Sequence, residues 1–407
     1  MPKQDSNLLT AIDLGSAKTC AVVAEITETG LRYRGHGIAE SRGTRRGMIV
    51  DIDKVVASAH RAVEEAEGLL EQPIEHASVG VAGPHIRGVG SQGGVALGTR
   101  PREITREDVR MAIEKARSIA LPDDRQPLHL LPQEYIVDEQ KGVQDPLGMV
   151  GRKLEVRVHV VTASTSATQN IVTALNKTGI HVDDTVFEPL ACADAVLRSD
   201  ERELGVCLAD IGAGSTDLIV LYEGAVQHTG YVPVGGDHFS NDVAVGLRTP
   251  LGAADTIKRQ FGCAVVTQIP AYTEIEVPSV GDRPSRMMQQ RLLGEILEPR
   301  ARELMEMVRE HLRQAGVLEL CGAGLVLTGG GARLPGLAEI VDQTMHKPAR
   351  VGSPAAIAKL PSDLSTPEFA TAIGLLLYAY RSRMARGLPE NNGFRSRLRG
   401  WFARSRS

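Results

Sequence analysis

The sequence predicts an α/β protein with a duplicated, two-lobed fold, an inserted small α/β subdomain and a C-terminal amphipathic helix. Three observations support this prediction. An Asp-apolar-Gly turn between two apolar runs occurs twice, at Asp13 and at Asp210, roughly half a chain apart. A third glycine-rich turn, at residues 329–331, follows another apolar run. Residues 394–407 combine arginines with aromatic side chains at helical spacing.

The composition is that of a globular protein with a substantial core. The 407 residues are 42% hydrophobic and 24% charged, and this length suggests two or three domains or one large duplicated fold. The net charge of -4 gives no overall indication of nucleic-acid binding. The five cysteines form no Cys-x-x-Cys pair, so we expect buried free thiols. No apolar run is long enough to span a bilayer, and the N-terminus lacks a signal core, which predicts a cytoplasmic protein with at most peripheral membrane contact.

The first lobe is predicted from residues 8–82 together with 164–203. Apolar runs separated by a tight turn predict strands, and apolar side chains at helical spacing predict helices. In chain order we expect strands at 8–14, 19–26 and 31–39, a helix at 53–70, a strand at 76–82, a helix at 164–178, a strand at 181–187 and a helix at 189–198.

The inserted subdomain is predicted at residues 83–163, where the apolar runs become shorter and more often interrupted. Glycine and proline separate short runs there, which is typical of a small α/β unit. The expected elements are strands at 92–97, 128–138 and 154–161 around one helix near 105–118.

The second lobe is predicted from residues 204–234 and 315–380, with a small subdomain at 235–314. Residues 381–393 are polar and contain glycine and proline, so we interpret them as a flexible linker. The expected elements are strands at 204–211, 216–222, 226–234 and 324–328, several helices within 235–314 of which the longest spans 288–314, and helices at 335–345 and 367–380.

The two Asp-apolar-Gly turns contain the residue types that bind phosphate. Glycine lets the backbone turn tightly, and successive N–H groups in such a turn can bind an anion. Ser16, Ser215 and Thr216 can add hydroxyl donors, and Lys18 can add a positive charge. Either turn alone is also compatible with an ordinary hairpin, whereas the pair favours a ligand.

Asp13 and Asp210 each end an apolar run, so both are expected to face a cleft between the lobes. Two carboxylates facing a polyphosphate require a cation, and Mg²⁺ suits such a site because it keeps several waters. Residues 329–332 follow a buried strand, where a backbone without side chains can pack against a base and ribose. The chain has no P-loop and no G-x-G-x-x-G after its first strand, which argues against P-loop and Rossmann enzymes.

The order of these motifs resembles the actin-like ATPase superfamily and, within it, the FtsA family of bacterial cell-division proteins. The resemblance covers nearly the whole chain, and it implies an actin-like (ribonuclease H-like) fold that binds Mg-ATP. It is carried by RELGVCLADIGAGSTDLIVLYEGAV, TIKRQFG, IEVPSVGDRP, LVLTGGGARLPGL, the insertion after VGVAG and the basic tail.

The resemblance also implies roles for individual residues. Helices at 189–198 and 367–380 would be the two hinge connections between the lobes. Asp13 and Asp210 would hold the metal, through water. The first phosphate loop would comprise Asp13, Gly15, Ser16 and Lys18, the second Asp210, Gly212, Gly214, Ser215, Thr216 and Asp217, the nucleoside contacts Gly329, Gly330, Gly331 and Ala332, and the ribose and adenine contacts Gly235, Gly236 and Lys258.

Glu188 is the one candidate for a catalytic residue. Glu188-Pro189 resembles the acidic connection of some actin-like relatives, in which the acid orients the attacking water. A structural role as a negative charge at a helix N-terminus is an equal alternative. We therefore expect at most a slow ATPase, with ATP acting as a conformational and polymerisation ligand.

The tail has the pattern of a helix that lies on a membrane surface. Each arginine near an anionic leaflet contributes about 1 kcal/mol, so one tail would bind reversibly and many tails in a polymer would bind strongly. A nucleic-acid-binding arm and a helix docked on the protein's own core remain alternatives. The apolar face comprises Phe394, Leu398, Trp401 and Phe402, and the basic residues include Arg395, Arg397, Arg399 and Arg404.

The resemblance implies a filament-forming adaptor that tethers FtsZ to the cytoplasmic face of the inner membrane at the division site and recruits later division proteins. The C-terminal peptide of FtsZ would dock at residues 275–300, with Arg286 and Arg300 as contacts, although solvated surface charge is an alternative interpretation of both. A small-molecule kinase of the same superfamily is the alternative function. A chaperone-like ATPase would need a peptide-binding domain that this chain is too short to contain.

Overall fold

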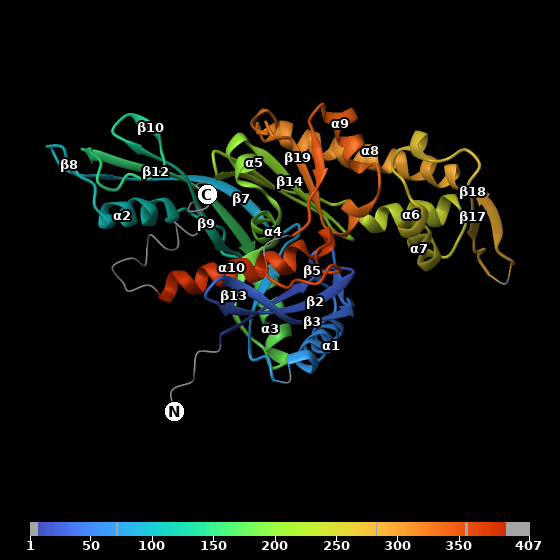
Figure 1. The fold of residues 1–407 in the computed structure, drawn as a ribbon. Helices are drawn as coiled ribbons and strands as arrows, with labels where there is room; N and C mark the ends of the chain where they lie inside the picture. The colour runs from blue at the N-terminus through green and yellow to red at the C-terminus, as the bar shows by residue number, and fades with distance from the viewer. Residues whose placement is uncertain (1–6, 71, 282, 355–356, 388–407) are drawn as a thin grey trace.

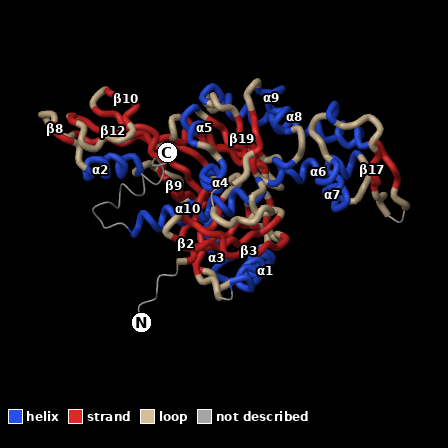
Figure 2. The backbone as a smooth tube through the Cα atoms, in the orientation of Figure 1, coloured by secondary structure: helices blue, strands red, loops and turns tan. Residues whose placement is uncertain are grey.

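The computed structural model describes residues 7–70, 72–281, 283–354 and 357–387. Two lobes, each built on a five-stranded sheet, lie one above the other in Figure 1, and a smaller subdomain extends to each side. Helices cover the sheets of both lobes, as Figure 2 shows in blue and red. The α/β fold with an insertion is therefore the one predicted.

The sheet of the first lobe has the strand order β13-β6-β1-β2-β3. The three strands β1, β2 and β3 are antiparallel neighbours, whereas β1, β6 and β13 run parallel. Helices cover both faces of this sheet, so β1 and β2 are apolar along most of their length. The elements are β1 (Leu8–Leu14), β2 (Lys18–Thr27), β3 (Gly30–Glu40), the small hairpin β4 (Thr44–Arg45) and β5 (Met48–Ile49), α1 (Ile52–Leu70), β6 (His76–Val81), α3 (Thr165–Lys177) and β13 (His181–Phe187).

The second sheet repeats this arrangement in the order β16-β15-β14-β19-β20. Again three antiparallel strands come first, and two parallel strands complete the sheet. The strand β20 is not among the predicted elements, because three residues carry too little periodicity. The elements are α5 (Ser199–Leu204), β14 (Val206–Ile211), β15 (Thr216–Tyr222), β16 (Ala225–Val232), β19 (Leu325–Thr328), α9 (Leu337–Met345) and β20 (Ala349–Val351).

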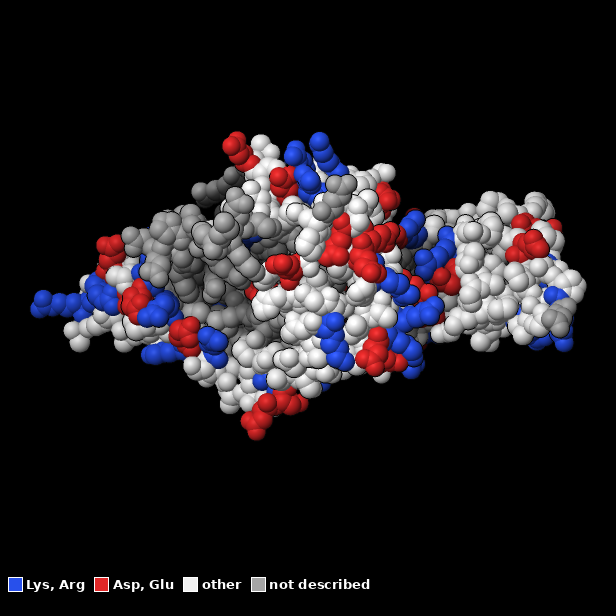
Figure 3. Space-filling view, turned by 90° about the horizontal axis from the view of Figure 1, so that it is seen from below, with Lys and Arg blue, Asp and Glu red and all other residues white. Residues whose placement is uncertain are grey.

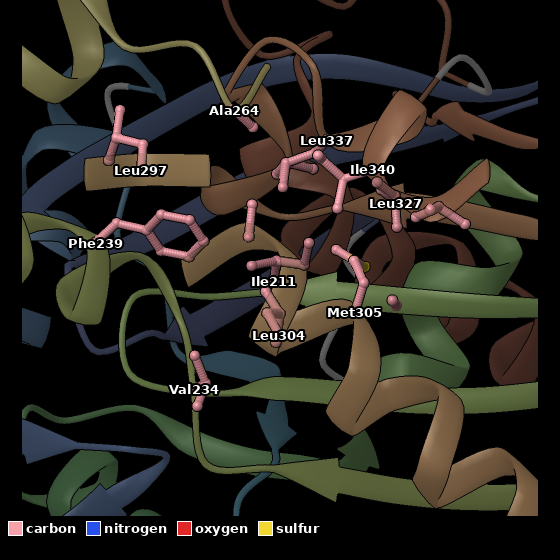
Figure 4. Close-up of a cluster of buried hydrophobic side chains, with 14 of the residues drawn as sticks. Ile211, Val234, Phe239, Ala264, Leu297, Leu304, Met305, Leu327, Leu337 and Ile340 are labelled. Atoms are coloured by element: carbon pink, nitrogen blue, oxygen red, sulfur yellow. The ribbon is translucent and has the colours of Figure 1, made fainter. Parts of the chain in front are cut away.

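A buried cluster fixes the end of β14, where the second turn begins. Figure 4 shows Ile211 of β14 among side chains from α8 (Gln290–Gln314), from α9 and from β19. Leu304 and Met305 of α8 are fully buried in this cluster. Burying each such side chain contributes about 1.5–3 kcal/mol, so the cluster holds the turn rigidly in place.

The inserted subdomain is a four-stranded sheet in the order β10-β9-β12-β7, with one helix packed on it. The helix α2 begins with a capping box, in which Thr105 and Asp108 bond each other's backbone. The elements are β7 (Arg87–Ala96), β8 (Arg102–Glu103), α2 (Arg106–Arg117), β9 (Arg125–Val137), β10 (Gln140–Val143), β11 (Val150–Gly151) and β12 (Lys153–Ser164).

The small subdomain of the second lobe lies at the opposite end of the molecule (Figure 1). It contains the expected helices and also a two-stranded hairpin that the sequence analysis does not predict. The elements are α6 (Gly236–Gly246), α7 (Leu251–Phe261), β17 (Glu274–Val277), β18 (Arg286–Gln289) and the N-terminal part of α8.

The two expected hinge helices, α4 (Glu188–Val196) and α10 (Ala370–Gly387), pack against each other between the lobes. A Cβ on Gly374 would lie 2.0 Å from the carbonyl oxygen of Ala191, so only glycine permits this approach. The prediction of a linker from residue 381 is wrong up to Gly387, where α10 continues. Residues 381–386 are mostly good helix formers without proline, and Arg381 pairs with Asp194 of α4.

Residues 388–393 and the predicted membrane-binding tail, from Phe394 to Ser407, lie outside the described residues. Among the helices that are described, none is both long and apolar enough to cross a bilayer. All five cysteines are buried and unpaired, as expected. Acidic and basic side chains are interspersed over the face seen from below in Figure 3.

Candidate nucleotide-binding cleft

A cleft of about 480 Å³ lies between the two lobes. The β1–β2 turn forms one wall, the β14–β15 turn faces it, and the glycines after β19 complete the site. The predicted residues that line it are Asp13, Gly15, Ser16, Lys18, Glu188, Asp210, Gly212, Gly214, Ser215, Asp217, Gly236, Lys258, Gly329, Gly330 and Gly331.

Three predicted residues do not line the cleft. The hydroxyl of Thr216 donates to the carbonyl oxygen of Val234 at 2.8 Å and is fully buried. Ala332 faces the core of the second lobe. Gly235 lies behind the second turn, where an added Cβ would be 2.6 Å from the amide nitrogen of Ser215. These three residues support the walls from behind.

In both turns the glycine lies close to the carbonyl oxygen of the residue three positions later, Lys18 in the first turn and Ser215 in the second. In the first, a Cβ on Gly15 would lie 2.8 Å from the carbonyl oxygen of Lys18, so the chain can close only with glycine there. In the second, the amide of Gly212 donates to the carbonyl oxygen of Ser215 at 2.9 Å. The start of α6 braces this second turn, because the amide of Gly236 donates to the carbonyl oxygen of Gly212 at 2.9 Å.

Among the acidic residues that line the cleft, Asp13, Glu188, Asp210 and Asp217 have carboxyl groups that interact with one another. Burial raises the pKa of Asp13 to about 6; the Lys18 charge opposes this rise, and the Asp210 carboxylate adds to it. Burial, followed by the Asp210 carboxylate, raises the pKa of Asp217 to about 7. The pKa of Glu188 is raised well above its usual range by burial and then by the charges of Asp13, Asp217 and Asp210. A cation among these groups would relieve their repulsion.

The geometry fits a divalent cation bound between the turns. Asp13 and Asp210 come from opposite lobes, line the same cleft and interact electrostatically. Their oxygens, with room for water, are the donors that Mg²⁺ prefers. The glycines of both turns line the same space, and backbone amides of such turns can bind phosphate oxygens.

The two hinge helices hold the Asp210 carboxylate in position, which the sequence analysis did not anticipate. Its Oδ2 accepts hydrogen bonds from the Cys192 thiol of α4 and the Thr371 hydroxyl of α10, both at 3.2 Å. These two donors lie 3.1 Å apart. On the other side, a Cβ on Gly329 would lie 2.3 Å from Asp210 Oδ1. The bonds keep the pKa of Asp210 from rising as far as burial alone would raise it.

Glu188 is the first residue of α4 and lines the floor of the cleft. A Cβ on Gly80 of β6 would lie 2.7 Å from Glu188 Oε1, so this glycine makes room for the carboxyl group. The raised pKa of Glu188 favours its protonated form, and a bound cation would favour its ionised form. Only the ionised form could accept a proton from water.

The two lysines predicted to bind the nucleotide, Lys18 and Lys258, both form hydrogen bonds within the protein. Lys18 donates to the carbonyl oxygen of Glu368, and its Nζ lies 4.1 Å from the centre of the Phe369 ring. This contact joins the first lobe to the second. Lys258 donates to the carbonyl oxygen of Gly236 at 2.9 Å and pairs with Asp255.

The two arginines predicted to bind a partner lie outside the cleft, on the small subdomain of the second lobe. Arg286 donates to Ser279 and to the carbonyl oxygen of Leu247. Arg300 forms ion pairs with Asp242, at 2.6 Å, and with Glu303. Both side chains therefore have intramolecular partners.

Comparison with known proteins gives a consistent result. Residues 207–374 match the family model described as "Cell division protein FtsA", and residues 83–162 match "SHS2 domain inserted in FTSA". The proteins named cell division protein FtsA from Pseudomonas aeruginosa and Neisseria meningitidis are 42% and 37% identical to the chain. The matches cover 93% of the chain and 91% of the first relative, and 99% of the chain and all of the second.

Solved structures share the fold at low sequence identity. A "PilM-PilN type IV pilus biogenesis complex" superposes with a TM-score of 0.67 at 19% identity, covering 91% of this chain and 98% of that one. MreB5 of Spiroplasma citri bound to ADP has a TM-score of 0.56 at 12% identity, covering 94% and 98%. These likenesses concern the two-lobed architecture alone.

Proposed function

Because the chain belongs to the FtsA family of bacterial cell-division proteins and has an actin-like fold, we propose that it binds Mg-ATP between its lobes and tethers FtsZ filaments to the cytoplasmic membrane. The observation that supports nucleotide binding most directly is the pair of Asp-apolar-Gly turns facing one cleft from opposite lobes. The comparisons do not favour the small-molecule kinase kept as an alternative, since the similar proteins are named for cell division.

In this proposal the amides of both turns and the hydroxyls of Ser16 and Ser215 bind the phosphates. Asp13 and Asp210 hold Mg²⁺ through water, and the metal supplies positive charge against the phosphates and the buried carboxylates. The glycines after β19 pack against the nucleoside. MreB5 of Spiroplasma citri, which has a similar fold, has been solved with bound ADP and with bound AMPPNP, and this supports the choice of an adenine nucleotide.

ATP would act mainly as a ligand that joins the lobes. A nucleotide touching both turns adds contacts that exist only when the lobes are close, and so favours the closed form. Glu188 at the start of α4 would orient water once a cation has ionised it, so we propose a slow ATPase at most. Closure would favour self-association into filaments.

The tail supplies membrane attachment in this proposal. A basic helix with Trp401 and Phe402 on its apolar face binds an anionic surface reversibly, and filaments add avidity. The protein would then lie at the cytoplasmic face of the inner membrane, at the division site, and recruit later division proteins there.

The FtsZ C-terminal peptide would dock on the small subdomain of the second lobe. Apolar side chains are exposed near the β17–β18 hairpin: Tyr272 is 94% exposed, and Val280 and Met287 are also exposed. Arg286 and Arg300 tie this region to α6 and α8, and in this proposal their charge attracts an acidic peptide. Apolar anchors beside positive charge are suited to a short acidic and apolar segment.

Co-sedimentation with anionic vesicles tests the adaptor function. The full chain with Mg-ATP should pellet with vesicles, and a chain truncated after Gly393 should stay in the supernatant. A W401A/F402A variant separates apolar insertion from charge, because it keeps every arginine. Electron microscopy of the lipid-bound protein with ATP should show filaments. Equal binding by the full and truncated chains, or by neither, would contradict the role of the tail.

A further inference from the structure

Two histidines and an aspartate meet at the start of the parallel pair β6 and β13, at the end of these strands that is farther from the cleft residues Gly80 and Glu188. His181 lies directly opposite His76 in the register of the two strands, so their side chains share one face. The register shifts between Val182 and Asp184, which leaves Asp183 as an extra residue in β13. Such a bulge re-aims the side chain of the extra residue.

The three side chains are close together and accessible. Asp183 Oδ1 lies 2.8 Å from His76 Nδ1, and the rings of His76 and His181 have centroids 5.2 Å apart. One ligand atom from each residue lies within 4.8 Å of the other two, and all three residues are exposed. Exposed side chains can rotate by the small amount needed to close around an ion.

We propose that His76, His181 and Asp183 form a binding site for a transition-metal dication of the Zn²⁺ type. Two imidazole nitrogens and one carboxylate are ligands that suit zinc, whereas Mg²⁺ prefers oxygen ligands alone. The metal takes the lone pair of one imidazole nitrogen of each histidine, so a proton held between His76 Nδ1 and Asp183 moves to Nε2 or to solvent. Three protein ligands leave a fourth position for water.

The chain contains a natural comparison for this site. His60 and Glu64 on α1 also form an exposed histidine–carboxylate pair, at 3.1 Å. Among the described residues, however, only the group at β6 and β13 brings three potential ligand atoms, two imidazole nitrogens and a carboxylate oxygen, within 4.8 Å of one another. The contact between His60 and Glu64 is that of an ordinary surface ion pair. Such a pair does not explain why His181 lies beside His76 and Asp183.

The position of the site gives it a structural consequence. His181 is the first residue of β13, and Phe187, the last, immediately precedes Glu188 in the cleft. The two strands run parallel from the metal ligands toward the cleft. A metal joining β6 and β13 at their starts therefore braces the strand that positions Glu188.

Isothermal titration of the chelator-treated full chain with Zn²⁺, in saturating Mg²⁺ so that the cleft carboxylates are occupied, tests the proposal. The wild type should bind one more Zn²⁺ per chain than an H76A/H181A variant. D183N should weaken binding by about tenfold or more, and H60A should bind as the wild type does. Co²⁺ in place of Zn²⁺ should give visible absorption bands in the wild type and H60A only.

Thermal unfolding keeps the test independent of folding defects. Without zinc, the wild type, H60A and H76A/H181A should unfold at similar temperatures, because these side chains are exposed. Added Zn²⁺ should raise the unfolding temperature of the wild type and H60A in a concentration-dependent way and leave the double variant unchanged. The proposal is overturned if the wild type takes up no zinc, or if the double variant binds it with the same stoichiometry and affinity.

Discussion

At the scale of single residues, the carboxylates of the cleft repel one another when no cation is bound between them. Asp13 and Asp217 are buried, and the carboxylate of Asp210 raises the pKa of both. Without nucleotide this repulsion lowers the stability of the folded protein, and bound Mg-ATP would remove it. Three predictions follow from the surroundings of individual side chains.

Replacing Asp13 by Asn should change the magnesium dependence of ATP binding. With Mg²⁺ the variant should bind ATP about 10- to 100-fold more weakly, because an interaction with a charged group of about 1.5–3 kcal/mol is lost. Without Mg²⁺ it should bind at least as well as the wild type, since one negative charge facing the phosphates is gone. Titration with a fluorescent ATP analogue measures both. D53N on the exposed start of α1 is the control, and equal losses with and without Mg²⁺ would contradict the metal role.

The pKa of Asp217 predicts how stability depends on pH. Its folded pKa of about 7 lies above the ordinary 3.8, so its contribution to stability is fully present below about pH 3.8 and is lost as the pH rises through 7. The metal-free wild type should therefore lose free energy of unfolding relative to D217N between pH 4 and pH 7. Urea unfolding at several pH values measures this difference, and a difference that stays constant would refute the shift.

Gly329 should tolerate no side chain. Its φ is 81°, and an added Cβ would lie 2.3 Å from Asp210 Oδ1. We expect G329A to cost about 1–3 kcal/mol of unfolding free energy and to weaken Mg-ATP binding by displacing that carboxylate. G330A is the matched comparison for stability, because its Cβ would meet only the Glu368 side chain, at 3.8 Å. Similar stability losses in both variants would contradict this account.

At the scale of elements, both hinge helices contribute residues to the cleft, Glu188 from α4 and Thr371 from α10. The Thr371 hydroxyl at the start of α10 donates to Asp210, so T371V, which keeps the side-chain volume, should weaken Mg-ATP binding by about tenfold. T371S retains the hydroxyl and should bind like the wild type. The ATP-analogue titration distinguishes them, and unchanged affinity in T371V would show that α10 does not position Asp210.

The sequence predicts the elements that have strong local patterns and misses those that depend on distant partners. The central strands of both sheets were predictable because apolar runs flank an Asp-apolar-Gly turn. The short strand β20 and the polar β17–β18 hairpin have no such pattern. The bonds from Cys192 and Thr371 to Asp210 could not be predicted, because the two donors are 179 positions apart and meet only after both lobes have folded.

At the scale of the whole molecule, polar contacts link the two lobes near the cleft. Lys18 of the first lobe bonds Glu368, and Arg46 Nη2 donates to His238 Nε2 at 3.2 Å. A ligand touching both turns would add to these contacts and hold the lobes together.

Hydrogen exchange should therefore report binding from both lobes at once. Mg-ATP should slow amide exchange at residues 13–19 and at 210–217 over the same concentration range. The helix α2, in the inserted subdomain away from the cleft, serves as the internal reference and should not change. Protection confined to one lobe would contradict a ligand held by both.

The continuous helix α10 has a mechanical consequence. Its first turn bonds the Asp210 carboxylate through Thr371, and it runs unbroken to Gly387. Tension applied to the chain beyond Gly387 would act along one stiff rod whose other end touches the cleft. A load on an anchored molecule would then strain the proposed nucleotide site, so force and occupancy would be coupled within a single helix.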